Sequence, residues 1–102
     1  MTDSNISIAN YSIGFGNPAF IIAEAGVNHF GKLERAYQLV DMAVEAGTDA
    51  IKFQHFNAER MISSRDPKWL ERMKSKQLTI SEITKIKQYC DNQGIIFLCS
   101  AH

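Results

Sequence analysis

Charged and amide side chains stand at the ends of two short apolar runs in this sequence. Glu24 closes the run FIIAE, and Lys52 and Gln54 alternate with Ile51 and Phe53 in DAIKFQ. Side chains of a strand alternate between two faces, so Lys52 and Gln54 share one face. A buried ammonium group needs a partner, either a carboxylate or an anionic ligand. If both runs are parallel strands, Glu24 and Lys52 meet at one rim, as a site for acid/base chemistry and anion binding or as a simple ion pair.

The loop after the first run, GVNHFG, carries two further polar residues, Asn28 and His29. Glycines at both ends of this loop, Gly26 and Gly31, allow the backbone to approach a ligand closely. A single loop histidine is usually polar surface. The case for His29 therefore depends on the motif around it.

Histidines and cysteines have no metal-ligand spacing in this chain. His29, His55 and His102 each follow a different predicted strand, with one histidine per loop. We therefore expect no complete metal site. Cys90 and Cys99 lie nine residues apart without a CxxC pattern, and we expect both to be reduced, buried thiols.

Alternating strands and helices must position the polar residues. Apolar runs and helical periodicity predict the following elements: strands at 20–24, 49–54 and 95–99, and a helix at 33–46. Residues 55–76 predict a long loop that includes a short turn of helix. The order of strands and helices predicts an α/β fold with a parallel sheet and right-handed crossovers. Ligands of such folds bind at the carboxyl ends of the strands.

A second long helix has a clear start signal. Thr79 and Glu82 have the spacing of a capping box, and Leu78 and Ile83 that of a hydrophobic staple. This helix is expected to end at Gly94.

The N-terminal residues predict a separate lead-in. The segment ISIANYSI at 6–13 indicates a short β-hairpin, and GFGNP then interrupts it. We divide the chain into a lead-in, residues 1–18, and a unit of three strands and two helices, residues 19–102.

The composition favours small-molecule chemistry. Of 102 residues, 45% are hydrophobic and 22% charged, which is typical of one soluble globular unit. Eleven basic residues balance eleven acidic ones, so no net field attracts nucleic acid or an anionic membrane. The sequence shows neither a secretory signal nor a run of about 18 apolar residues that could span a membrane. We expect a cytoplasmic protein without nucleic-acid or membrane partners.

Three stretches together resemble the N-acetylneuraminate (sialic acid) synthase family. FIIAEAGVNHFG carries the family pattern AExGxNH, DAIKFQHF carries KFQ, and GIIFLCSA matches the next strand. The resemblance, from about Phe20 to Leu98, implies the N-terminal portion of a TIM (β/α)₈ barrel. It also implies an enzyme that condenses phosphoenolpyruvate with an N-acetylated hexose, such as N-acetylmannosamine. The products would be a nine-carbon 2-keto sugar acid and phosphate, and a divalent metal, manganese or magnesium, would assist.

The resemblance also implies roles for individual residues. Lys52 matches the phosphoenolpyruvate-binding lysine of KFQ, and Gln54 matches the glutamine that lines the site. Glu24 matches the acidic residue of AExGxNH, a catalytic acid/base or substrate-contacting group. Asn28 and His29 match the final pair of that motif, which shapes the active-site loop and contacts substrate.

Two departures from the family limit what this chain could do alone. Where the family often reads FxSTPF, this chain reads FLCSAH, and Ser100 keeps a substrate-binding hydroxyl while Cys99 and His102 replace other residues. A closed barrel has eight strands and typically about 250 residues. In the family, the metal-binding histidines lie on later strands, and a C-terminal antifreeze-like domain completes the site of a neighbouring subunit. The resemblance therefore implies a homodimer when full length, and we expect the 102-residue chain alone to be inactive.

Two alternatives remain open. The chain could be a truncated, non-catalytic remnant or interaction module that pairs with another barrel piece through open sheet edges. It could instead belong to a pseudaminate or legionaminate synthase, because these enzymes share the motifs. The intact AExGxNH and KFQ motifs favour an enzyme, and the end of the chain after the third predicted strand favours a remnant.

Overall fold

A computed structural model describes residues 6–9, 11–58 and 66–101. Its elements are, in order, β1 (Ile6–Ile8), β2 (Tyr11–Ile13), β3 (Ile22–Gly26), α1 (Leu33–Glu45), β4 (Ala50–His55), α3 (Pro67–Lys74), α4 (Ile80–Gln93) and β5 (Ile96–Ala101). In these ranges, no helix combines the length and the apolar character that crossing a bilayer requires.

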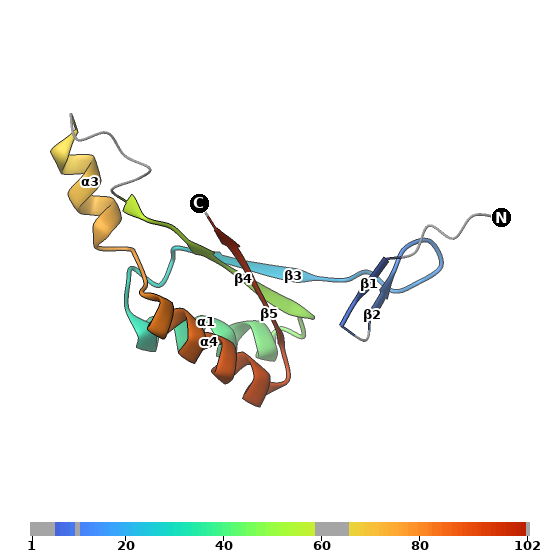
Figure 1. The fold of residues 1–102 in the computed structure, drawn as a ribbon. Coiled ribbons are helices and arrows are strands. Elements are labelled where there is room, and N and C mark those ends of the chain that lie inside the picture. Colours follow the sequence, from blue (N-terminus) through green and yellow to red (C-terminus); the bar gives the residue numbers. More distant parts are fainter. Residues whose placement is uncertain (1–5, 10, 59–65, 102) are drawn as a thin grey trace.

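The predicted N-terminal hairpin is confirmed. β1 and β2 pair antiparallel, with Ile6 opposite Ile13. Ala9 takes up the turn with a φ of 53°, in the left-handed region that tight hairpin turns use. Figure 1 shows the hairpin apart from the larger sheet and joined to it by an extended segment. The ring of Tyr11 packs edge-on against that of Phe20, with 5.4 Å between the centroids.

The larger sheet confirms the predicted α/β fold. β3, β4 and β5 lie side by side in sequence order, and both pairs are parallel. Helices alternate with these strands along the chain, as they do in successive units of a (β/α)₈ barrel. The carboxyl ends of the three strands therefore lie at the same edge of the sheet.

The first core strand begins and ends two residues later than predicted. β3 spans Ile22–Gly26 rather than 20–24. Ile21 precedes the strand and is held by Asp49, whose Oδ2 accepts the Ile21 N–H at 2.8 Å and whose own N–H donates to the Ile21 carbonyl at 2.9 Å. The register shifts between Glu24 and Gly26, so the strand continues past the apolar run through an irregularity that the sequence pattern does not mark.

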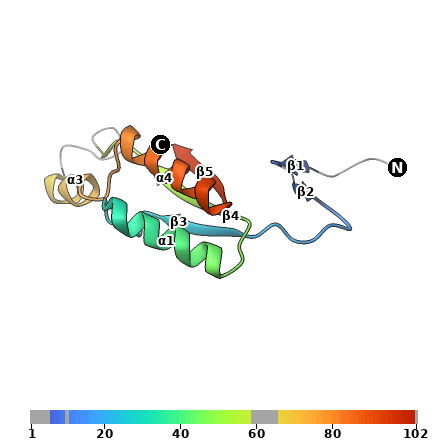
Figure 2. The same cartoon turned by 90° about the horizontal axis from the view of Figure 1, so that it is seen from below.

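Helices α1 and α4 cover one face of this sheet (Figure 2). Their apolar residues pack with Ile51 and Phe53 of β4 in one buried cluster. The two helices also contact each other, because Tyr37 stacks on Tyr89 with centroids 4.5 Å apart. The Tyr89 hydroxyl donates a hydrogen bond of 2.5 Å to Asp41 Oδ1.

The predicted start of α4 is confirmed. The Glu82 N–H donates to Thr79 Oγ1 at 3.1 Å, and the Thr79 N–H donates to Glu82 Oε1 at 3.0 Å. Leu78 is buried in the core cluster and Ile83 packs against that cluster, as a hydrophobic staple requires. Gly94 ends the helix with a φ of 77°.

The short helix predicted within residues 55–76 is α3. Asp66 caps it by accepting the Trp69 N–H at 3.1 Å, and Pro67 occupies its first turn.

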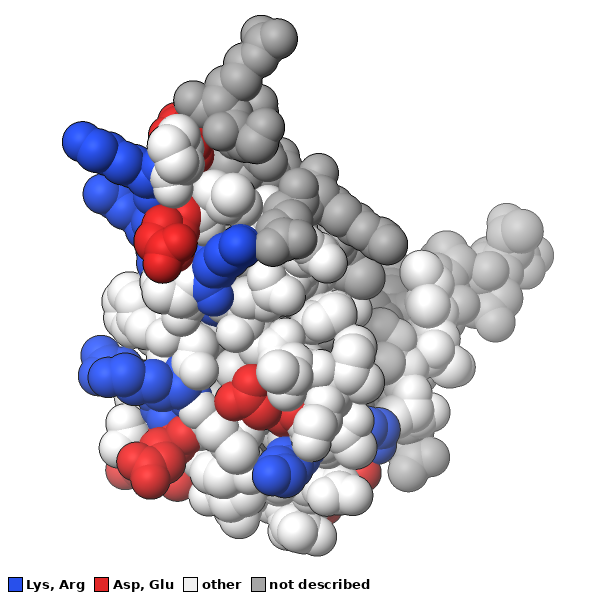
Figure 3. Space-filling view, turned by 60° about the vertical axis from the view of Figure 1, so that its left-hand side comes forward, with Lys and Arg blue, Asp and Glu red and all other residues white. Residues whose placement is uncertain are grey.

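Figure 3 shows basic and acidic side chains interspersed on the face that it draws, without a broad patch of one sign.

The expectation of two buried thiols is confirmed for Cys90 and wrong for Cys99. Both cysteines are free, but only Cys90 is buried. Cys99 lies near the carboxyl end of β5, an edge strand of the described sheet, and is not among the residues that pack with α1 and α4.

Candidate active site

Four of the predicted site residues share one face of the sheet. Glu24 pairs in register with Lys52, and Gln54 pairs with Ser100. Side chains of register partners in a parallel sheet leave it on the same side, and residues two apart along β4 also share a side. Phe53 points the other way, into the core beneath α1 and α4. We call the face of Glu24, Lys52, Gln54 and Ser100 the open face, because no described element covers it (Figure 1).

Glu24 and Lys52 lie side by side on the open face without forming an ion pair. Neighbouring strands are about 4.8 Å apart, which brings an ammonium and a carboxylate within reach of one small ligand. Glu24 is exposed and Lys52 is half-buried. In the part of the chain that the structure describes, Lys87 and Asp91 form an ion pair, and none joins Glu24 to Lys52. Both charges are therefore available: the ammonium to bind a carboxylate or phosphate, and the carboxylate to move a proton or orient a hydroxyl.

Gln54 and Ser100 extend this polar row toward the carboxyl ends of β4 and β5. Both residues are half-buried. An amide and a hydroxyl offer both donors and acceptors, which suits them to hold the polar groups of a substrate. Leu98, the register partner of Lys52, adds an apolar surface beside the lysine.

Asn28 lies just beyond the carboxyl end of β3. Its side chain is exposed, and its backbone N–H donates to the Ala25 carbonyl at 3.0 Å. That bond turns the chain immediately after the strand. Asn28 therefore stands at the rim where ligands of parallel α/β folds bind.

His29 lies on the helix-covered side, away from the open face. Its side chain is 0% exposed, and its ring centroid is 6.1 Å from that of the core residue Phe53. Nδ1 accepts the Gly31 N–H at 2.9 Å, so the neutral ring carries its proton on Nε2, which has no partner among the described residues. Burial lowers the pKa of His29, and the Glu82 carboxylate partly opposes that shift. The structure thus makes His29 a buried support of the loop.

Two contacts near these residues have no clear sequence signal. The close backbone approach expected of the loop glycines occurs at Gly31, but toward the protein's own backbone: a Cβ there would lie 2.2 Å from the Ser75 carbonyl oxygen. The side chain of Gln77 accepts the Ala58 N–H through Oε1 at 3.1 Å. Both contacts join residues far apart in the sequence, which periodicity and motif spacing do not detect.

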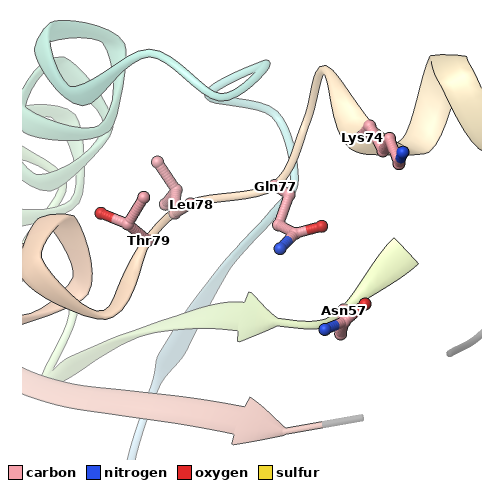
Figure 4. A pocket seen from close by; sticks show the side chains of 5 residues that line it. All are labelled: Asn57, Lys74, Gln77, Leu78 and Thr79. Carbon is pink, nitrogen blue, oxygen red and sulfur yellow. The ribbon is translucent and has the colours of Figure 1, made fainter. Parts of the chain in front are cut away.

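A polar pocket of about 380 Å³ lies beyond the carboxyl end of β4. Its lining residues, shown in Figure 4, are Asn57, Lys74, Gln77, Leu78 and Thr79. Gln77 reaches into it from the segment between α3 and α4. This pocket extends the polar surface of the carboxyl-end edge of the sheet.

Metal-binding side chains do not gather anywhere in the described ranges. No three histidine, cysteine, aspartate or glutamate side chains of residues 6–9, 11–58 and 66–101 lie close enough to hold an ion. Glu24 is the carboxylate of the open face, and its neighbours there contribute an ammonium, an amide and a hydroxyl.

Comparison with known proteins defines the class of protein to which this arrangement belongs. The model of the NeuB family matches residues 39–102. The spore coat polysaccharide biosynthesis protein SpsE of Bacillus subtilis is 41% identical over 101 residues, covering 89% of this chain and 27% of that protein. An N,N'-diacetyllegionaminic acid synthase of Legionella pneumophila is 52% identical over 50 residues, covering 49% of this chain and 14% of the enzyme.

A solved structure has the same fold. The N-acetylneuraminic acid (sialic acid) synthetase of Leptospira borgpetersenii, solved in complex with citrate, superimposes with a TM-score of 0.89 at 34% identity. The match covers 96% of this chain and 34% of the synthetase chain. The chain therefore belongs to the NeuB family, and it spans about a quarter to a third of the length of SpsE and of the synthetase.

Proposed function

We propose that this chain forms part of a phosphoenolpyruvate-dependent sugar-acid synthase. The reaction joins phosphoenolpyruvate to an N-acetylated hexose such as N-acetylmannosamine, consumes water, and yields a nine-carbon 2-keto acid and phosphate. The observation that carries this proposal is the convergence of Glu24, Lys52, Gln54 and Ser100 on the open face.

Lys52 is proposed to hold an anionic group of phosphoenolpyruvate. Its ammonium is half-buried without a carboxylate partner among the described residues, and a bound anion would supply the missing charge. Glu24, beside it, is proposed as the catalytic carboxylate that exchanges a proton with the substrate or orients its reacting group.

The remaining site residues are proposed to bind and position substrate. Gln54 and Ser100 offer hydrogen bonds along the open face, and Asn28 does so from the rim. His29 is proposed to hold the loop that carries Asn28, because its buried ring accepts the Gly31 N–H within that loop.

A divalent cation, which the family resemblance implies, finds no donor set of its own in the described part of the chain. No described residue is therefore assigned to manganese or magnesium. In our proposal, its ligands belong to later parts of a complete barrel. A cytoplasmic location and a homodimer are likewise part of the proposal.

The acceptor sugar has two alternatives within the same chemistry. Similarity to the N,N'-diacetyllegionaminic acid synthase of Legionella pneumophila supports a legionaminate-type reaction as the alternative to one with N-acetylmannosamine. A pseudaminate-type reaction is a further alternative within the same chemistry.

Phosphate release tests the proposed reaction. The protein, as its own cell produces it, is incubated with phosphoenolpyruvate, manganese and each candidate sugar, and the product is identified by mass spectrometry. We expect phosphate only when an acceptor is present, together with an equal amount of a sugar acid longer by three carbons. Absence of both products with every acceptor would overturn the proposal.

Open sheet edges favour a second candidate, a module that assembles with another barrel piece. Among the described residues, β3 and β5 each pair on one side only, and Ile21 and Ile22 at the start of β3 are 52% and 44% exposed. The intact mass of the cellular product distinguishes the two candidates. A product of synthase length supports the enzyme, and a product that ends at His102 supports the module.

A further inference from the structure

The loop after β3 rests directly on the segment that joins α3 to α4. We call residues 27–32 the β3 loop and residues 75–78 the bridge segment. Gly31 lies so close to the bridge segment that a Cβ would be 2.2 Å from the Ser75 carbonyl oxygen. The Phe30 ring lies 5.6 Å from Lys76 Nζ, a cation–π contact with the same segment.

The bridge segment also holds the chain that follows β4. Gln77 Oε1 accepts the Ala58 N–H at 3.1 Å, and Ala58 is fully buried. A buried N–H without an acceptor is costly, so this bond fixes where the chain runs after β4. Figure 4 shows Gln77 reaching from the bridge segment toward that chain.

The core anchors the bridge segment between these two contacts. Leu78 is 2% exposed and belongs to the main apolar cluster, and Thr79 begins α4 with its capping box. The bridge segment is therefore fixed at its end, and it contacts both the β3 loop, at Gly31, and the chain after β4, at Ala58.

We propose that the bridge segment sets the position of the β3 loop relative to the end of β4, with Gln77 as the positioning residue. Asn28 stands on the first of these elements, and Gln54 stands near the end of the second. A displacement of about 1 Å between groups that hold the substrate can lower the reaction rate roughly 100-fold. The effect on catalysis rests on the proposed function, but the mechanical coupling does not.

Hydrogen exchange tests the coupling without any substrate. The variant Gln77→Met keeps the length of the side chain and removes the acceptor, whereas Gln77→Glu keeps an acceptor oxygen. Gln88→Met on the exposed side of α4 is the matched control. The Val40 amide, in the buried part of α1, reports global unfolding.

We expect Gln77→Met to speed exchange of the Ala58 amide and also of the distant Gly31 amide, each by about 10-fold relative to Val40. In the Gln77→Glu and Gln88→Met variants, the Ala58 and Gly31 amides should exchange at the wild-type rates. Faster exchange at Ala58 with unchanged exchange at Gly31 would overturn the proposal, because Gln77 would then hold only its own partner. If Gln77→Met does not fold, Gln77→Asn withdraws the acceptor by shortening the side chain. The exchange rates of the Ala58 and Gly31 amides in that variant then test the proposal.

Kinetics provide the second readout. In the phosphate-release assay, Gln77→Met should lower kcat by about 10-fold with little change in the KM for phosphoenolpyruvate, and Gln77→Glu should restore most of it. Equal kcat values for Gln77→Met and wild type would contradict the claim that Gln77 affects turnover. If the wild type releases no phosphate, the proposed function fails. The hydrogen-exchange result still tests whether Gln77 couples the β3 loop to the chain after β4.

Discussion

Glu24 and Lys52 are register partners on neighbouring parallel strands, and their side chains leave the sheet on the face that α1 and α4 do not cover. Opposite charges at such a position commonly neutralise each other. Here no ion pair joins them within the described residues, although the strands bring them together. This relationship is the physical basis for proposing a site that binds an anion beside a working carboxylate.

Replacing the Glu24 carboxylate by an amide separates catalysis from binding. Glu24→Gln should lower kcat by about 100-fold or more, because a neutral amide cannot exchange a proton. The KM for phosphoenolpyruvate should change far less. Steady-state phosphate release measures both, with Glu45→Gln on the exposed end of α1 as control. A parallel loss of affinity and turnover would indicate that Glu24 serves only to support Lys52.

Gly31→Ala and Gly47→Ala form a matched pair for the β3 loop. Both glycines have positive φ values, 73° and 78°, but a Cβ meets the Ser75 backbone at Gly31 and nothing within 4 Å at Gly47. Gly47→Ala should lower the free energy of unfolding by about 1 kcal/mol through its backbone conformation. Gly31→Ala should lower the free energy of unfolding by at least about 1 kcal/mol more than Gly47→Ala does, because the Ser75 carbonyl must move. Equal losses in denaturant titrations would contradict the close approach.

The burial of His29 predicts acid sensitivity. Because its folded pKa lies below the ordinary value of 6.5, the unfolded chain takes up a proton that the folded chain does not. Stability should therefore be fully present above about pH 6.5 and fall as the pH decreases through the lowered folded pKa. Protonation would also turn Nδ1 into a donor and break its bond to the Gly31 N–H.

His29→Asn tests this sensitivity, since an amide oxygen can replace the acceptor without titrating. The free energy of unfolding of this variant should vary less between about pH 5 and pH 7 than that of the wild type. His55→Asn serves as the control for loss of a histidine. Identical pH slopes for His29→Asn and wild type would show that His29 does not contribute.

Tyr89→Phe should weaken the contact between α1 and α4 while keeping the ring stack on Tyr37. The hydroxyl bond to Asp41 is lost, so Tm should decrease at neutral pH. Asp41→Asn keeps an oxygen acceptor and should melt close to the wild type. The hydrogen bond raises the pKa of Tyr89, so its contribution is present below about pH 10 and is lost as the pH rises through the raised pKa. A Tm for Tyr89→Phe equal to that of the wild type would argue against the bond.

Local patterns in the sequence predicted most of the fold. The period of the apolar residues gave the order of strands and helices, and the spacing of Thr79 and Glu82 predicted the observed start of α4. The first core strand was shifted by two residues. Ile21, just before it, bonds to Asp49, 28 residues away, and the pairing of the strand is irregular between Glu24 and Gly26. Long-range hydrogen bonds of this kind leave no local signal.

The candidate site was predictable where it depends on strand alternation. Residues two apart on β4 had to share a face, and parallel strands had to bring Glu24 beside Lys52. The position of His29 was not predictable in this way, since a loop residue has no periodicity to show whether it lies outside or beneath the helices. The bridge segment was missed for the same reason: Gly31 and Ser75, like Ala58 and Gln77, are joined only by tertiary structure.

The affinity for phosphoenolpyruvate is the most direct test of the central claim that the open face binds an anion through Lys52. Calorimetric titration should compare the wild-type protein with Lys52→Met and with Lys87→Met, which removes an exposed α4 lysine paired with Asp91. We predict that Lys52→Met binds phosphoenolpyruvate at least about 10-fold more weakly, because a charge-assisted hydrogen bond is lost, and that Lys87→Met binds it as the wild type does. Equal affinities for all three proteins would contradict the account.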